Sequence, residues 1–164
     1  MVPRFPLYNP IPEHLKELCI NQQWVKLEFR NGIKEGTGVF ATGPFERNEV
    51  VCNYGGIFLN EDYVKENLFP DKEKCDYLIE IKTGYKSCFY LNHDRTTESK
   101  VYGKYLNHSA KHPNLFMRVY ALNDKLEILF YAKHRIVRGT QLVWDYGKMF
   151  RGVNDCVESC AKCH

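Results

Sequence analysis

Two short segments of this sequence combine residue types that could carry out chemistry. The triplet Asn-His-Ser at 107–109 follows an apolar pair and places an amide, an imidazole and a hydroxyl in a row. Such a triplet could ligate a metal, assist a nucleophile, cap a helix, or hold a cofactor by its amide and backbone. The triplet Asp-Tyr-Gly at 145–147 comes later, after the strand-like "QLVW". The role of neither triplet can be inferred from its own residues, so it has to be inferred from the predicted elements around them.

Length and composition predict one globular domain. The chain has 164 residues, of which 44% are hydrophobic and 26% charged. A net charge of +3 is too small to argue by itself for nucleic-acid binding. We find no apolar run near the roughly 20 residues that cross a bilayer, and no apolar core of a secretory signal at the start. Four cysteines lie singly among apolar residues, which favours buried thiols in a reducing, intracellular compartment. These are Cys19, Cys52, Cys75 and Cys88.

Short strands dominate the predicted elements, and they are separated by Gly, Asn, Asp and Pro turns. The predicted strands are 24–29, 38–42, 49–59, 76–81, 87–92, 114–122, 125–134 and 141–144, with hairpin turns at Asn31-Gly32, within 82–86 and at Asn123-Asp124. One helix is predicted from Glu13 to about Asn21, with Pro12 suited to its first turn. A second helix is predicted from Asn60, as N-cap, to Leu68. This pattern predicts a mainly β fold.

Several motifs occur in a defined chain order. They are "EGTGVFAT" (35–42), "CNYGG" (52–56), "CDYLIEI" (75–81), "KYLNHSAKHPN" (104–114) and "GTQLVWDYGKMF" (139–150). In this order they resemble the SET-domain protein-lysine methyltransferases. The resemblance implies several small β-sheets with short helices and a C-terminal pseudoknot, in which the Asn-His-Ser and Asp-Tyr-Gly segments pass through one another. It divides the chain into a lead-in with a short helix (1–23), a SET domain (24–150) and a cysteine-containing tail (151–164).

The resemblance also implies a pocket for S-adenosylmethionine. Asn107 would hydrogen-bond the amino-acid part of the cofactor, and the backbone of His108 would meet its adenine. Lys104 stands where the family usually has arginine, which keeps the charge but loses the planar fork. Glycines at 36 and 38 would let the backbone approach the cofactor closely. The residues placed against the cofactor are Glu35, Gly36, Thr37, Gly38, Tyr77, Lys104, Asn107, His108, Tyr146 and Phe150.

Three aromatic residues form the predicted catalytic set. Methyl transfer needs a neutral lysine amine, whereas the free side chain has a pKa near ~10.4. An apolar channel lined by tyrosines would favour the neutral form, and a tyrosine hydroxyl would aim its lone pair. The resemblance gives this role to Tyr146, with Tyr54 as the second wall. Trp144 occupies the position that limits the number of methyl groups, and its bulk favours few of them. Asn53 departs from the family, which usually has an acidic residue there.

The tail contains a cysteine cluster with the spacing C-x3-C-x2-C-H. Clustered cysteines of this kind are typical of zinc ligands, and many SET domains end in such a segment. The family's further cysteine, directly after Asn-His-Ser, is Ala110 here. A zinc site and a metal-free tail therefore both stay open. The predicted zinc ligands are Cys156, Cys160, Cys163 and His164.

The predicted partner is a histone tail or another lysine-containing peptide, bound as an added strand. The segment 94–109 resembles the branch that monomethylates histone H4, whereas the "VW" at 143–144 resembles the PR subgroup, some of which have little known activity. Two alternatives stay open: a catalytically silent PR/SET-like module that binds a chromatin partner, and a zinc-dependent binding module. The family implies the nucleus. We infer no direct nucleic-acid or membrane binding, and the sequence leaves the oligomeric state open.

Overall fold

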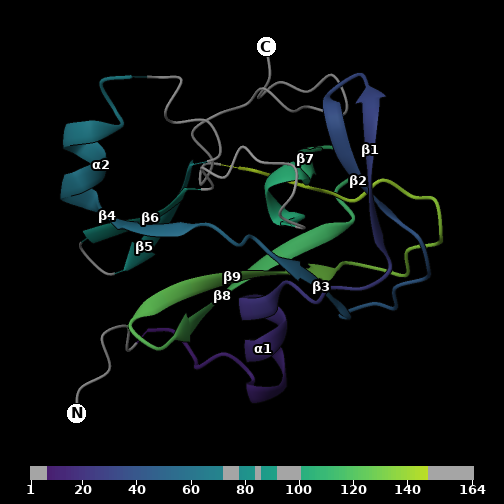
Figure 1. Cartoon of the computed structure of the whole chain (residues 1–164), viewed down its shortest axis with the longest axis horizontal. Helices are drawn as coiled ribbons and strands as arrows, with labels where there is room; N and C mark the ends of the chain where they lie inside the picture. Colours follow the sequence, from purple (N-terminus) through teal and green to yellow (C-terminus); the bar gives the residue numbers. More distant parts are fainter. Residues whose placement is uncertain (1–6, 72–77, 84–85, 92–100, 148–164) are drawn as a thin grey trace.

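The computed structural model describes residues 7–71, 78–83, 86–91 and 101–147. Within these ranges the chain forms three small β-sheets, two short α-helices and one turn of 3-10 helix. The prediction of a mainly β fold is therefore confirmed. Figure 1 shows α1 against the five-stranded sheet and α2 beside the three-stranded sheet.

The largest sheet has the strand order β3-β9-β8-β10-β7. Its strands are β3 (Val50–Asn53), β7 (Asn107–His108), β8 (Leu115–Leu122), β9 (Lys125–Ala132) and β10 (Val143–Trp144). β8 and β9 form the hairpin predicted around residues 123 and 124, and they pair antiparallel along their whole length. Asn123 lies at the turn with a φ of 56°, a conformation that asparagine tolerates better than most residues.

β10 runs parallel to both of its neighbours and lies between β7 and β8. Val143 pairs with Asn107, and Trp144 pairs with His108. Since β7 and β8 are consecutive in the chain, the connection 109–114 passes around β10. This is the crossing of the Asn-His-Ser and Asp-Tyr-Gly segments that the resemblance implied.

The prediction of a turn at residues 31 and 32 was wrong. β1 (Leu27–Ile33) continues through them and pairs with β2 (Gly36–Ala41), so the chain turns three residues later, at Lys34 and Glu35. The register shifts between Asn31 and Ile33, and Gly32 has a φ of 72°. An Asn-Gly pair supplies the left-handed backbone of a tight turn, and here the same freedom serves a β-bulge.

The predicted strand 49–59 is two strands in two sheets. β3 ends at Asn53, and β4 (Ile57–Asn60) starts the three-stranded sheet β4-β6-β5. Gly55 separates them with a φ of 70°, which breaks the extended backbone. β5 (Leu78–Thr83) and β6 (Lys86–Leu91) form the hairpin predicted with its turn within 82–86.

Both predicted α-helices are present. α1 (Glu13–Asn21) follows Pro12, which is the N-cap rather than a residue of the first turn, and it buries Leu15 and Cys19. α2 (Glu61–Asn67) is capped by Asn60, whose side chain accepts a hydrogen bond from the backbone of Tyr63. Neither helix, nor any other in the described part, has the length and hydropathy to span a membrane.

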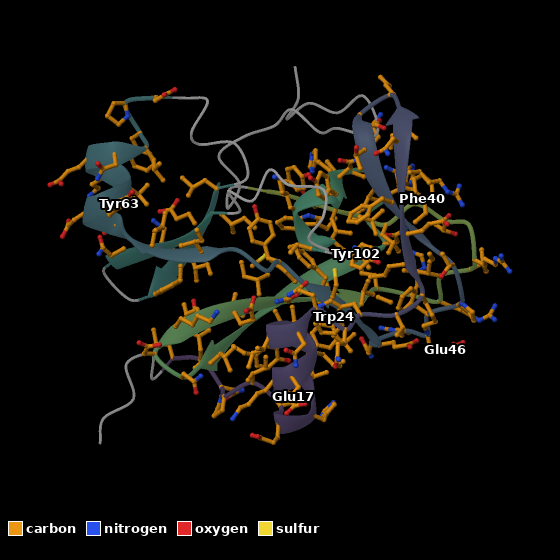
Figure 2. All side chains as sticks on the ribbon, in the orientation of Figure 1. Glu17, Trp24, Phe40, Glu46, Tyr63 and Tyr102 are labelled. Carbon is orange, nitrogen blue, oxygen red and sulfur yellow. The ribbon has the colours of Figure 1, made fainter. Side chains whose placement is uncertain are left out.

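The core lies between α1 and the sheets and extends to the crossing. Trp24 lies between α1 and β3, where its Nε1 donates to Asn53 Oδ1 at 2.9 Å (Figure 2). The same apolar cluster contains all three predicted catalytic residues, Tyr54, Trp144 and Tyr146. The candidate site is thus built from core side chains and not from exposed loops.

Candidate active site

Asn107 holds β7 against the edge of β2. Its side chain is 1% exposed, and its Nδ2 donates to the carbonyl of Thr37 at 3.2 Å. Gly38 lets these side chains lie against the backbone, because an added Cβ would lie 2.7 Å from Gln141 Nε2 and 3.3 Å from Asn107 Nδ2 and would displace them. The structure therefore brings together the two segments that the sequence placed under one cofactor.

His108 is buried and supports the backbone of the Asp-Tyr-Gly segment. Its Nδ1 accepts a hydrogen bond from the N–H of Tyr146 at 3.1 Å, so the ring proton lies on Nε2 and the imidazole is neutral. Asp145 Oδ1 is 3.9 Å from the same nitrogen, which is beyond hydrogen-bonding distance. His108 thus acts through its side chain as a scaffold, whereas the predicted contact of its backbone with adenine stays a prediction.

Tyr146 is a core residue whose hydroxyl is fixed. The hydroxyl donates to the carbonyl of Leu106 at 2.7 Å, directly before Asn107 in the chain. The ring lies 4.8 Å from that of His108 and 4.9 Å from that of Trp144. Contacts from both crossing segments therefore set the position of this hydroxyl.

Trp144 lies at the centre of the aromatic cluster. Its ring is 5.0 Å from that of Phe130, and the residue is 3% exposed. Its Nε1 finds no hydrogen-bond partner within the part of the chain that the structure describes. A buried donor without a partner costs about 1–3 kcal/mol, so this N–H suits a water molecule or a ligand. Trp144 also lines a hollow of about 340 Å³ beside Lys111, Met117 and Asp145.

The remaining predicted residues are placed unequally. Glu35 and Gly36 lie at the turn between β1 and β2, and Lys104 is buried with its Nζ 5.4 Å from the ring of Tyr105. The other predicted site residues lie outside the described residues. They are the predicted cofactor contacts Tyr77 and Phe150 and the predicted zinc ligands Cys156, Cys160, Cys163 and His164. Among the described residues, no three metal-ligating side chains converge.

Sequence reasoning missed Asn114, which fastens the crossing. Its Nδ2 donates to the carbonyl of Gln141 at 2.8 Å, and its Oδ1 accepts from the N–H of Val143 at 2.9 Å. The residue had been assigned only to the start of a strand. Nothing in the sequence around it signals this role, because both partners lie almost thirty residues away along the chain.

Sequence reasoning also missed Glu127, a buried carboxylate in β9. Burial raises the pKa of the Glu127 carboxyl to about 6, against the effect of hydrogen bonds from Asn53 and Gly55. Here a signal existed: a single acidic residue interrupts the apolar stretch "LEILFYA". Acidic residues are almost never fully buried unless they are paired, so this position warranted attention.

Comparison with known proteins agrees with this geometry. The model of the SET domain family matches residues 36–147, which is most of the chain. The chain belongs to the SET-domain family. This SET domain is 31% identical over 143 residues to the zebrafish (Danio rerio) N-lysine methyltransferase KMT5A-A, covering 82% of the chain and 39% of that relative. It is 28% identical over 125 residues to the histone-lysine N-methyltransferase set-1 of Caenorhabditis elegans, covering 74% of the chain and 50% of that relative.

Solved structures show the same fold. The crystal structure of CpSET8 from Cryptosporidium superposes with a TM-score of 0.65 at 24% identity, covering 87% of this chain and 69% of that one. A Chaetomium thermophilum Polycomb Repressive Complex 2 structure reaches a TM-score of 0.57 at 20% identity, over 76% of this chain and 15% of that one. The chain spans half or less of the length of the curated relatives named above.

Proposed function

We propose that this SET domain transfers a methyl group from S-adenosylmethionine to the side-chain amine of a lysine in a protein. The observation that carries the proposal is the fixed hydroxyl of Tyr146, which the crossing holds against the carbonyl of Leu106 at 2.7 Å. Because its proton goes to that carbonyl, the hydroxyl would meet the substrate amine as an acceptor of its N–H. This would aim the lone pair of the amine, which is the positioning part of catalysis.

Residues around Asn107 fit the cofactor. The Nε2 of Gln141 is a buried donor with no partner among the described residues, and it faces Gly38 close to Asn107. Two amide donors beside a glycine suit the carboxylate of an amino acid, and Lys104, three residues before Asn107 in the chain, would add a positive charge. S-adenosylmethionine, when bound, would supply an electrophilic methyl group on a sulfonium ion.

The aromatic cluster would do three things for the substrate. Tyr54, Trp144 and Tyr146 are all buried, so they would exclude water from the amine and favour its neutral form. Their rings would hold the aliphatic part of the lysine by apolar contact. The bulk of Trp144 leaves little room for a second methyl group, so we propose monomethyl-lysine as the main product.

The relatives and the fold support a proposal for the substrate class. The relatives' names describe lysine and histone-lysine methyltransferases, and we propose a histone tail as the substrate and the nucleus as the site of action. The peptide would add a strand to a sheet edge of the domain. For the tail we keep the proposal of zinc bound by Cys156, Cys160, Cys163 and His164, which would order a segment next to the site.

The experiment that tests this proposal is a methyl-transfer assay on a histone mixture and on an array of histone-tail peptides, followed by mass spectrometry. We expect a mass increase of one methyl group on a single lysine position, and no increase with Tyr146→Phe. Calorimetry with S-adenosylmethionine runs beside it. Cofactor binding without turnover on any peptide would favour the silent interaction module instead.

A further inference from the structure

Glu127 is an acidic residue that is buried although the proposed site does not use it. It lies in β9, is 3% exposed, and belongs to none of the site residues assigned above. An ionised carboxylate in a protein interior costs several kcal/mol unless hydrogen bonds and charges compensate it. Lys125 Nζ is 4.0 Å away, but it is 41% exposed and therefore compensates only in part.

The hydrogen bonds of Glu127 offset a further part of this cost, and they converge on the end of β3. Oε1 accepts the N–H of Ile128 at 3.1 Å, and the carboxylate also accepts from the side chain of Asn53 and the N–H of Gly55. The orientation of the Asn53 amide is fixed, because its oxygen already accepts from Trp24 Nε1 and Gln22 Nε2, each at 2.9 Å. Its nitrogen must therefore face the acid.

These bonds fix the backbone on both sides of Tyr54. The N–H of Tyr54 donates to the carbonyl of Ile128 at 3.0 Å, which is the last backbone bond that ties β3 to β9. The next residue, Gly55, turns away with a φ of 70°, and the carboxylate of Glu127 takes its N–H. The side chain thus replaces the backbone partner that the turn removes.

A packed path leads from this turn to the proposed catalytic hydroxyl. Gly103 lies so close to β3 that an added Cβ would be 2.3 Å from Asn53 O and 2.5 Å from Tyr54 Cα. The 3-10 helix η2 (Gly103–Tyr105) leads directly into Leu106, whose carbonyl accepts the Tyr146 hydroxyl. A shift of the turn at Tyr54 would therefore be passed on to Tyr146 through backbone atoms that have no room to move.

We propose that Glu127 is a positioning residue for methyl transfer, whose carboxylate holds the Tyr54 wall of the lysine channel in register with Tyr146. This inference rests on the proposed function for its catalytic meaning. The charged and titratable groups that face Glu127 are Lys125 on its own strand, Tyr120 opposite it on β8, and Cys19 from α1. Protonation of the carboxylate would remove one acceptor and loosen the turn, at a pKa of about 6.

The test compares Glu127→Gln with Glu49→Gln as a matched control. Glu49 is also an acid that binds a lysine and a backbone N–H, but it does so at the opposite end of β3. With a histone-tail peptide, we expect Glu127→Gln to lower kcat at pH 8 by at least about tenfold, with S-adenosylmethionine affinity unchanged and Glu49→Gln normal. The difference in kcat between the parent and Glu127→Gln should shrink below pH 6, because the parent carboxylate is then also protonated. Protonation of the substrate lysine affects both enzymes equally, so it cancels in the ratio of their kcat values.

A second measurement needs no activity and separates this inference from the proposed function. In protein labelled with ¹³C-tyrosine, the ring signals of Tyr54 and Tyr146 should shift with pH near 6 in the parent and not in Glu127→Gln. A parent without methyl transfer but with this titration overturns the proposed function and leaves the positioning of both tyrosines standing. Two results would overturn the inference: tyrosine ring signals in the parent that do not shift with pH near 6, or a kcat of Glu127→Gln equal to that of the parent at every pH.

Discussion

The β8–β9 hairpin and the β7–β10 crossing hold their strands together by different means. The hairpin strands are eight residues long and pair through backbone bonds from Leu115↔Ala132 to Leu122↔Lys125. The crossing strands are two residues long, so fewer backbone bonds join them than join the hairpin. Buried side chains add to these bonds: Asn114 binds Gln141 and Val143 at the start of β10, and His108 binds the N–H of Tyr146.

The difference explains where the site lies. A long hairpin distributes its backbone bonds over eight residue pairs, so no single bond decides whether the strands pair. The crossing depends on a few buried polar side chains, and the backbone groups that they bind would be left without a hydrogen bond if the side chain were removed. Single substitutions of these polar side chains should therefore disturb function or stability strongly, whereas a change at the turn of the hairpin, around Asn123, should not.

The largest expected effect is that of Tyr146→Phe. Removal of the hydroxyl leaves the ring packing on Trp144 and His108 but abolishes the positioning of the amine. We expect methyl transfer to fall on the order of 100-fold or more, with S-adenosylmethionine still bound. A steady-state assay and calorimetry measure the two quantities. Full activity of the variant would remove Tyr146 from the mechanism.

Asn107→Ala should act on the cofactor. The variant loses a buried amide that binds the carbonyl of Thr37 and that, in the proposed function, also binds the cofactor. A hydrogen bond to a charged group contributes roughly 1.5–3 kcal/mol, so we expect binding of S-adenosylmethionine to weaken about 10- to 150-fold. Calorimetry on folded protein measures this. Unchanged affinity would show that the Asn-His-Ser triplet has a structural role alone.

Asn114→Ala and Asn123→Gly compare the two regions directly. The first leaves the carbonyl of Gln141 and the N–H of Val143 without their partner, and we expect it to lower the free energy of unfolding by roughly 2–3 kcal/mol. The second replaces a turn residue of the hairpin at a φ of 56° by glycine, and we expect a change within about 0.5 kcal/mol. Urea titrations give both values. Equal effects would contradict the contrast between hairpin and crossing.

The pH dependence of stability should reveal Glu127. Burial raises the pKa of its carboxyl to about 6 from 4.5, so the folded state binds the proton more tightly than the unfolded state. The stabilisation is fully present below pH 4.5 and is lost as the pH rises through 6. Its size is on the order of 2 kcal/mol. The difference in unfolding free energy between the parent and Glu127→Gln, measured from pH 4.5 to 7.5, should contain this change; a constant difference would exclude the titration.

Trp144→Phe should have the smallest effect on rate and the clearest effect on product. The smaller ring frees space beside the amine, so dimethyl- and trimethyl-lysine should rise relative to monomethyl-lysine. The ring also packs on Phe130 and Tyr146, so a cavity should lower the melting temperature by a few degrees. Product mass spectra and melting curves, run together, separate the two consequences. A parent enzyme that makes mainly trimethyl-lysine would rule out the restrictive role.

Local structure was largely predictable. The capping of α2 by Asn60 and the hairpin turn at Asn123 depend on neighbours within a few residues, so their signals lie in the sequence itself. The turn at residues 31 and 32 was predicted wrongly because an Asn-Gly pair supports a bulge as well as a turn, and the pairing of β1 with β2 decided between them. The break at Gly55 was missed because strand propensity continues on both sides of it.

The sequence by itself determined the mainly β fold, the family, and the two segments that carry the site, because motif order and strand patterns are written along the chain. Only the tertiary structure decided which groups those segments bind. Asn114 meets Gln141, Asn53 meets Glu127, and the Tyr146 hydroxyl meets the Leu106 carbonyl across separations of 27 to 74 residues. The physical reason is that a buried polar group is stable only with a partner, and folding, not sequence proximity, brings that partner within reach.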